Sequence, residues 1–316
     1  MSSESLRAFG AITHRRSMGN IPRMKKIILP LAFSEKMIYN MYIKCKNREA
    51  EENMFEKSNI LRSPHAFASR CGGVSVREHT KSLNLAFGRG DEDAVVLKNL
   101  EIFAEEVGFD PQNIISLPQI HSDKIFTVTK QNAGEGYYIR DGIESGDGYV
   151  TGECGVVLGI KTADCVPILF EAEKDGEIVA VGAVHAGWRG TVAQIAPKCV
   201  DRLCADFGAD KAHVRAAIGP CIHACCYEVS RDIYDEVTFS LGEDIARKYV
   251  KPSGLSEGKY MCDLAGINRE LLLLEGMHEG NIEIINECTC CNPEKYFSHR
   301  YSGGRRGTML NVIFMR

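Results

Sequence analysis

From about His65 to the C-terminus, the chain alternates two patterns of hydrophobic residues. Residues that recur at helical spacing predict amphipathic helices over 94–107, 191–207, 230–240 and 263–276. Short, nearly continuous apolar runs predict strands at 156–160, 166–170, 178–184, 214–218, 282–286 and 308–314, and 114–128 holds two shorter extended pieces. Ile178–Val184 is almost wholly apolar, so we expect a central strand that is buried on both faces.

These strands outnumber the crossover helices that a fully parallel sheet would need. We therefore expect a mixed α+β protein or a layered α/β/α arrangement rather than a doubly wound fold. The 316 residues are enough for one large domain or two small ones.

Residues 1–60 differ in composition from the rest of the chain. They hold eleven lysines and arginines against six acidic residues, but only two of the thirty glycines and one of the thirteen cysteines. We expect 1–60 to be an N-terminal extension, partly disordered, ahead of a catalytic domain at 61–316. A flexible basic tail, an element that docks on the body and dispensable upstream sequence all remain open. Met37–Ile43 is its best candidate for a strand.

The composition narrows the classes of function. The formal net charge is −4, which argues against a general affinity for nucleic acid. No run of about 18 apolar residues is present, so we expect no segment that spans a membrane. Thirteen cysteines would form disulfides in a secreted protein, but no N-terminal stretch reads as a signal peptide. We therefore expect reduced thiols and a cytoplasmic protein.

Three short segments place reactive side chains at predicted strand ends. His121 lies between two extended pieces, Cys165 joins two strands, and His185 ends the central strand. One thiol and two imidazoles suit zinc, and three protein ligands leave a fourth position for water or substrate. The spacings match no local zinc motif, so a metal site requires these strand ends to converge in space.

The neighbours of these three residues permit further roles. Arg189 follows a glycine-rich turn that enters a helix, where phosphate or ribose could bind. Asp164 is a candidate proton carrier or orienting residue. In a second hypothesis, Cys165 and His185 are the nucleophile and base of a thiol hydrolase that acts on an amide such as a cell-wall precursor. A third hypothesis is a non-catalytic binding protein.

Several motifs occur along the body in a fixed order. They are Thr162-Ala163-Asp164-Cys165-Val166-Pro167, Val184-His185-Ala186-Gly187-Trp188-Arg189-Gly190-Thr191, Ala217-Ile218-Gly219-Pro220-Cys221-Ile222 with Cys225-Cys226-Tyr227-Glu228-Val229, and Phe297-Ser298-His299-Arg300. Together they strongly resemble the laccase-domain family, once labelled multicopper polyphenol oxidases and now described as purine nucleoside phosphorylases. The resemblance covers about 62–316 and does not extend to 1–60.

This resemblance implies a single domain of layered α/β/β/α architecture with mixed sheets. It implies zinc held by His121, Cys165 and His185. The implied reactions are phosphorolysis of adenosine, inosine, guanosine and methylthioadenosine with phosphate, and deamination of adenosine. Two flanking motifs of the family also resemble this chain at Arg70-Cys71-Gly72-Gly73-Val74-Ser75 and Ser82-Leu83-Asn84-Leu85. Arg70 and Asn84 in these motifs are weaker candidates for substrate binding.

A copper polyphenol oxidase is the less favoured interpretation of the same resemblance. A multicopper cluster needs many histidines, several of them in His-x-His pairs. The chain has nine histidines and no such pair, so we expect zinc rather than copper.

Two further groups of cysteines are candidates for a second zinc site. They are Cys221, Cys225 and Cys226 in one group and Cys288, Cys290 and Cys291 in the other. The resemblance accounts for both as motif positions without a metal, so we expect no second structural metal.

Overall fold

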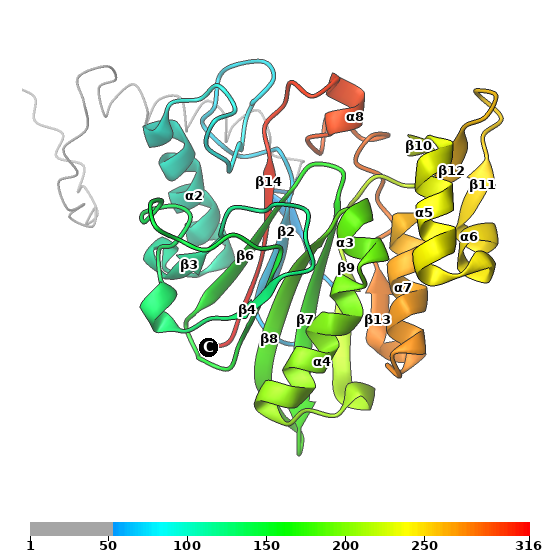
Figure 1. The fold of residues 1–316 in the computed structure, drawn as a ribbon. Coiled ribbons are helices and arrows are strands. Elements are labelled where there is room, and N and C mark those ends of the chain that lie inside the picture. Colours follow the sequence, from blue (N-terminus) through cyan, green and yellow to red (C-terminus); the bar gives the residue numbers. More distant parts are fainter. Residues whose placement is uncertain (1–52) are drawn as a thin grey trace, which may run out of the picture. The chain divides into compact units, whose positions relative to one another are not determined.

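The apolar runs of the body form two large β-sheets in a computed structural model, which describes residues 53–316 (Figure 1). The first sheet has the order β1 (Phe55–Glu56), β2 (His65–Ala68), β14 (Met309–Phe314), β6 (Val157–Thr162) and β3 (Ile114–Ile115). The second has the order β13 (Ile282–Ile284), β9 (Val214–Ile218), β7 (Val166–Lys174), β8 (Glu177–Ala186), β5 (Gly148–Thr151) and β4 (Ile125–Thr127). Both sheets mix parallel and antiparallel pairs.

Smaller elements complete the described part of the chain. A third, short sheet has the order β10 (Glu228–Val229), β12 (Tyr260–Cys262) and β11 (Val250–Pro252). The α-helices are α2 (Asp93–Val107), α3 (Trp188–Val192), α4 (Ile195–Phe207), α5 (Arg231–Leu241), α6 (Glu243–Tyr249), α7 (Leu264–Leu274) and α8 (His299–Ser302). Single 3-10 turns occupy Pro111–Asn113, Lys130–Asn132, Lys211–His213 and Glu279–Asn281.

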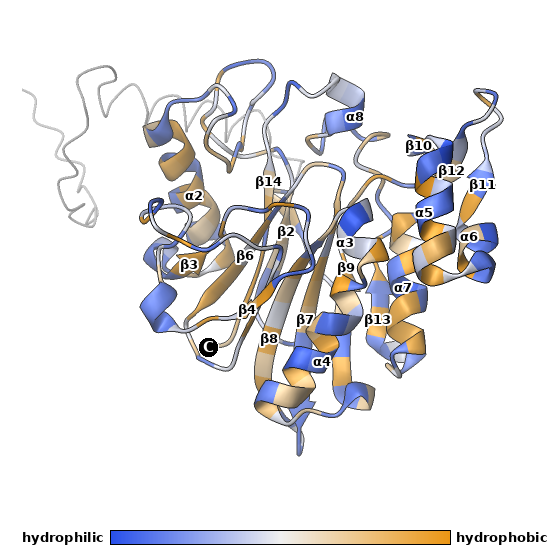
Figure 2. Ribbon diagram, in the orientation of Figure 1, coloured by the Kyte–Doolittle hydropathy of each residue, from blue (hydrophilic) through white to orange (hydrophobic). Residues whose placement is uncertain are grey.

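Helices cover the outer face of each large sheet. Leu100 and Phe103 of α2 pack with side chains of the first sheet, whereas α4 and α7 pack with side chains of the second. A separate buried cluster, which includes Phe67 and Leu169, lies between the two sheets. Figure 2 shows hydrophobic central strands and helices of mixed hydropathy. The expected α/β/β/α architecture with mixed sheets is therefore confirmed.

The predicted segment 191–207 is not one helix, which corrects that expectation. Two helices cover it, because Gln194 between α3 and α4 has φ of +59° and is left-handed. Pro197 supplies the physical reason, since it has no N–H to donate and its ring would clash with the carbonyl of Ala193 in a continuous helix. The other helices and strands predicted within residues 53–316 are found, most of them with shifted ends. The sequence reasoning missed strands β1, β2 and β5, helices α6 and α8, and the short third sheet.

The hairpin of β7 and β8 forms the middle of the second sheet and supplies two of the candidate ligands. Strand β8 is antiparallel to both neighbours, and its residues from Ala180 to Ala186 are buried. The expected central strand is confirmed. Pro167 pairs with His185 in this hairpin, so Cys165, just before β7, lies beside the end of β8.

The N-terminal limit of the domain lies near the start of the described residues. The segment Met37–Ile43 lies outside the described residues. Strand β1 falls within 1–60 and pairs with β2, so the end of that segment belongs to the first sheet. The division at residue 60 remains a proposal. Among residues 53–316, no helix is both long enough and apolar enough to cross a membrane.

Candidate metal centre and substrate pocket

The structure brings His121, Cys165 and His185 together. One ligand atom from each of the three lies within 4.8 Å of the others, and Cys165 Sγ is 4.0 Å from His121 Nε2. The two imidazole rings meet edge to face with their centroids 4.8 Å apart. Two imidazoles and one thiolate at this separation suit a zinc ion. His121 is exposed, Cys165 is half-buried and His185 is buried, so the group is reached from one side.

A buried carboxylate, Asp147, holds both histidines in place. Asp147 Oδ1 accepts a hydrogen bond from His185 Nδ1 at 2.8 Å and from the backbone N–H of His121 at 3.0 Å. Its other oxygen accepts from the N–H and the hydroxyl of Ser122 at 2.6 and 2.8 Å. With Nδ1 engaged, His185 presents Nε2 toward the other two ligands, an arrangement typical of metal-binding histidines.

Local backbone geometry explains why this group forms where it does. His121 has φ of +60°, a left-handed conformation that non-glycine residues rarely adopt, and the hydrogen bonds from this turn to Asp147 stabilise it. Gly187 must be small. A Cβ there would lie 3.0 Å from His121 Cδ2 and 3.4 Å from Cys165 Sγ. The glycine-rich turn therefore lets the chain pass close to the ligands.

The pKa values of Cys165 and His185 depend on each other. Burial by itself would raise the pKa of the Cys165 thiol, but the charge of His185 and a hydrogen bond from His121 lower it to about 6. Burial would lower the pKa of His185, whereas Cys165 and Asp147 raise it to about 9. Without a metal, a thiolate thus faces a protonated imidazole. A bound cation would take the place of that proton.

A cavity of about 350 Å³ has these three residues in its lining. Arg89, Arg140, Lys161 and Arg306 also line it, so the wall is strongly positive. The Nε of Arg306 is buried and has no hydrogen-bond partner among the described residues. The Phe87 ring lies in the same wall. A metal-ligand group and a cationic wall in one pocket suit a substrate that carries phosphate.

Burial and a neighbouring positive charge lower the pKa values of two of these cationic side chains. Burial and Arg89 lower the pKa of Lys161 to about 8. The same two causes lower the pKa of Arg306 to about 10. Lys161 Nζ donates to the carbonyl of Ser116 at 3.1 Å, which aims the ammonium group along the pocket wall. An anion in the pocket would relieve the repulsion between these groups.

Asp164 and Arg189 are outside the pocket lining. The Asp164 carboxylate accepts hydrogen bonds from the Thr289 hydroxyl and the Arg300 N–H, both at 2.7 Å. It therefore anchors the loop that carries Cys165. Arg189 is exposed and its guanidinium stacks 4.3 Å from the centre of the Trp188 ring.

Arg70 and Asn84 hold together loops near the pocket rather than line it. Arg70 donates to the carbonyls of Lys81 and Pro293 and stacks on the Phe297 ring. The buried side chain of Asn84 accepts hydrogen bonds from the N–H groups of Ala86 and Thr308. Ala86 and Thr308 both line the pocket, so Asn84 shapes the wall through the backbone.

Sequence reasoning missed Asp147, Lys161 and Arg306. A carboxylate between Gly146 and Gly148 was a signal, because the flanking glycines let the backbone pass close to other residues: a Cβ on either one would meet a side chain within 2.7 Å. No local pattern marked Lys161 as a pocket residue, since its role depends on where β6 ends. No local pattern marked Arg306 either.

Comparisons with known proteins show which family and which relatives this chain resembles. A family model described as multi-copper polyphenol oxidoreductase laccase matches residues 64–316. The chain is 32% identical to "Purine nucleoside phosphorylase YlmD" of Bacillus subtilis, over 79% of this chain and 87% of that protein. It is 31% identical to "Adenosine deaminase RL5" of an unknown prokaryotic organism, over 85% and 99%. The crystal structure of YlmD from Geobacillus stearothermophilus superposes with a TM-score of 0.74 at 32% identity, covering 84% of this chain and 99% of that one.

Proposed function

The chain belongs to the family described as multi-copper polyphenol oxidoreductase laccase, and on that basis we propose that it is a zinc-dependent purine nucleoside phosphorylase. The observation that carries the proposal is a single pocket that holds both a His–Cys–His group and a wall of arginine and lysine. Its substrates are adenosine, inosine, guanosine or methylthioadenosine, together with phosphate. Cys154, Cys165, Cys199 and Cys262 are free thiols, which favours a reducing compartment such as the cytoplasm.

Different residues of the pocket have different roles in phosphorolysis. A phosphate oxygen bonds to C1′ of the ribose, the bond from C1′ to the purine nitrogen breaks, and the base leaves with the electron pair and gains a proton. Lys161 and Arg306 bind and orient the phosphate, and the unpartnered Nε of Arg306 donates to one of its oxygens. The Phe87 ring offers a surface for the purine. We assign this phosphate role to Lys161 and Arg306 in place of Arg189.

His121, Cys165 and His185 would hold the zinc ion, and the donor set fits it. When bound, zinc supplies Lewis acidity at the floor of the pocket. Asp147 fixes the orientation of His185 and the turn at His121, and Asp164 anchors the loop before Cys165. A copper cluster of the kind that the family description suggests is not favoured, because the chain has no His-x-His pair.

Deamination of adenosine is a second candidate activity of the same pocket. It is favoured by the 31% identity to a protein named adenosine deaminase, of which this chain covers 99%. In this reaction water adds at C6 of the purine and ammonia leaves. The names of the relatives do not favour the thiol hydrolase or the non-catalytic binding protein.

The proposal is tested with purified, zinc-loaded full-length protein, adenosine or inosine, and phosphate. Ribose 1-phosphate and free base should form in equal amounts, only when phosphate is present. Cys165→Ala should lower the rate by more than about 100-fold, because a ligand is lost. Cys154→Ala is the matched control, since Cys154 is an exposed free thiol outside the group. Absence of ribose 1-phosphate with every nucleoside would refute the phosphorylase assignment.

A thiol-labelling experiment distinguishes the zinc-dependent phosphorylase from the thiol hydrolase. A hydrolase would use Cys165 as a free nucleophile, so an alkylating reagent would modify it whether or not zinc is present. A zinc ligand should be protected until a chelator is added. Labelling is read by peptide mass spectrometry at Cys165.

A further inference from the structure

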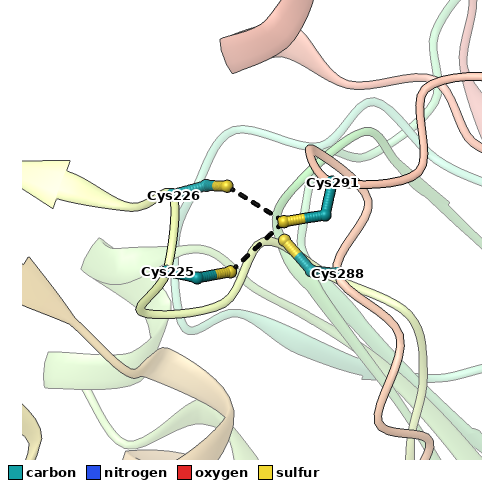
Figure 3. Close-up of side chains that lie close together, drawn as sticks. All are labelled: Cys225, Cys226, Cys288 and Cys291. Atoms are coloured by element: carbon teal, nitrogen blue, oxygen red, sulfur yellow. Dashed lines mark hydrogen bonds between the residues drawn. The ribbon is translucent and has the colours of Figure 1, made fainter.

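Four cysteines from two distant parts of the sequence converge on one point (Figure 3), and none of them lines the pocket described above. Cys225 and Cys226 lie between β9 and β10, and Cys288 and Cys291 follow β13. Cys291 Sγ is 3.4 Å from Cys225 Sγ and 3.3 Å from Cys226 Sγ. All four sulfur atoms lie within 4.8 Å of one another.

These separations fit sulfur atoms around a tetrahedral metal ion. Zinc–sulfur bonds of about 2.3 Å place the four sulfurs about 3.8 Å apart. A disulfide would bring two of them to about 2.05 Å, and none of the sulfur contacts here is that short. Figure 3 shows the sulfurs of Cys225, Cys226 and Cys288 gathered around that of Cys291, rather than arranged as two separate pairs.

The backbone holds the two loops in register. Cys221 and Cys288 form a parallel bridge, and the N–H of Thr289 donates to the carbonyl of Cys221 at 2.9 Å. The N–H of His223 points at Cys288 Sγ at 3.5 Å, a hydrogen bond of the kind that stabilises a metal-bound thiolate. The cysteines are therefore presented by ordered loops from both sides.

We propose that Cys225, Cys226, Cys288 and Cys291 form a closed structural zinc site, separate from the His121–Cys165–His185 group. Four protein thiolates fill the coordination sphere and leave no position for a substrate, as in structural rather than catalytic zinc sites. This reverses the expectation that the chain holds no second metal. The sequence signal is the adjacent pair Cys225-Cys226 followed by Cys288-Thr289-Cys290-Cys291, whose first and last residues have the Cys-x-x-Cys spacing.

The site would brace the loop that carries Cys165. Thr289, between two of the thiol ligands, donates to Asp164, and the N–H of Ile222 donates to the Asp164 carbonyl at 2.9 Å. Arg300, whose N–H also binds Asp164, donates through its guanidinium to the carbonyl of Cys226 at 2.8 Å. Asp164 has φ of +97°, a strained conformation that these contacts over-determine. Metal at the four thiols would thus fix the residue next to Cys165.

Metal content of purified full-length protein tests the proposal. The protein is expressed with zinc, kept reduced and dialysed against metal-free buffer. Wild type should retain about two zinc ions per chain, and Cys291→Ser or Cys226→Ser about one. Cys290→Ser is the matched control, because Cys290 lies in the same loop but outside the group, and it should retain about two.

A second measurement leaves the four thiols untouched. In Cys165→Ala, X-ray absorption should show about four sulfur neighbours at about 2.3 Å around the remaining zinc. Loss of all zinc from Cys165→Ala would refute the site, as would iron in place of zinc. A disulfide between these cysteines would also refute the site. It would be seen as a mass two hydrogens lower for the unreduced peptides that contain them. Because the variant lacks a ligand of the pocket group, the result does not depend on the phosphorylase assignment.

Discussion

At the scale of single residues, one carboxylate organises the pocket floor. Asp147 is fully buried, and its Oδ1 joins His121 to His185 by accepting a hydrogen bond from each. Its hydrogen bonds with His185 and Ser122 lower its pKa to about 2 against the opposing effect of burial. Asp147 therefore stays charged at neutral pH, which keeps His185 Nδ1 protonated and Nε2 directed at the ligand group.

Replacing Asp147 by asparagine should weaken zinc binding. The amide nitrogen of asparagine would face N–H donors, and the negative charge behind His185 would be lost. We expect zinc affinity to fall by about 10- to 100-fold, measured by competition with a chromophoric chelator. Asp123→Asn is the matched control, since Asp123 is in the same loop and forms an exposed ion pair with Lys198. Equal affinities for the two variants would contradict this role.

The pH dependence of phosphate binding should report on Lys161. Its pKa is lowered to about 8, so the side chain is a cation below that pH and becomes neutral above it. The KM for phosphate should therefore rise as the pH increases through about 8. Lys161→Arg keeps the charge, so its KM should stay low over the same range. If the two proteins share one profile, Lys161 does not bind phosphate. The KM for nucleoside provides the internal control.

At the scale of elements, the β7–β8 hairpin decides where two ligands meet. Asp175 and Gly176 at its turn have φ of +52° and +88°, as a two-residue type I′ turn requires. From this turn, the residues of β7 and β8 pair one by one as far as Pro167 and His185. The register shifts once on the way, between Ala172 and Glu173. Since a shift of one residue would turn His185 to the other face, the turn and this register shift together specify the site.

Gly176→Ala should destabilise this hairpin. A Cβ at Gly176 would meet no atom within 4 Å, so the cost comes only from the left-handed backbone. We expect the free energy of unfolding in urea to fall by about 1 kcal/mol. Gly254→Ala is the matched control, because Gly254 has the same open surroundings without a positive φ. A loss of equal size in both variants would rule out this explanation.

At the scale of the whole molecule, the pocket lies where the chain crosses from one sheet to the other. Cys165 connects β6 of the first sheet to β7 of the second. The pocket takes Lys161 and Thr162 from β6 and His185 from β8. Its shape therefore depends on how closely the two sheets pack. Gly219 and Phe67 are one such contact, since a Cβ on Gly219 would lie 2.1 Å from the Phe67 ring.

Gly219→Ala should overpack the space between the sheets. Phe67 is fully buried and its ring cannot move away without displacing its neighbours. We expect a loss of about 1–3 kcal/mol in the free energy of unfolding. Adding Phe67→Leu should recover part of that loss, although Phe67→Leu alone destabilises the protein. Additive effects in this double-mutant cycle would show that the two residues are not coupled.

The sequence by itself determined the order and type of most elements, because hydrophobic period depends on neighbours a few residues away. It also determined the choice of His121, Cys165 and His185 as candidates, since their chemistry and place at strand ends are local properties. Only the tertiary structure decided that Asp147, Lys161 and Arg306 join them and that Asp164 and Arg189 lie outside the lining. It also decided that four cysteines meet at one point. Such convergence depends on sheet register and crossover geometry, which bring together residues separated by tens of positions, and no local pattern encodes it.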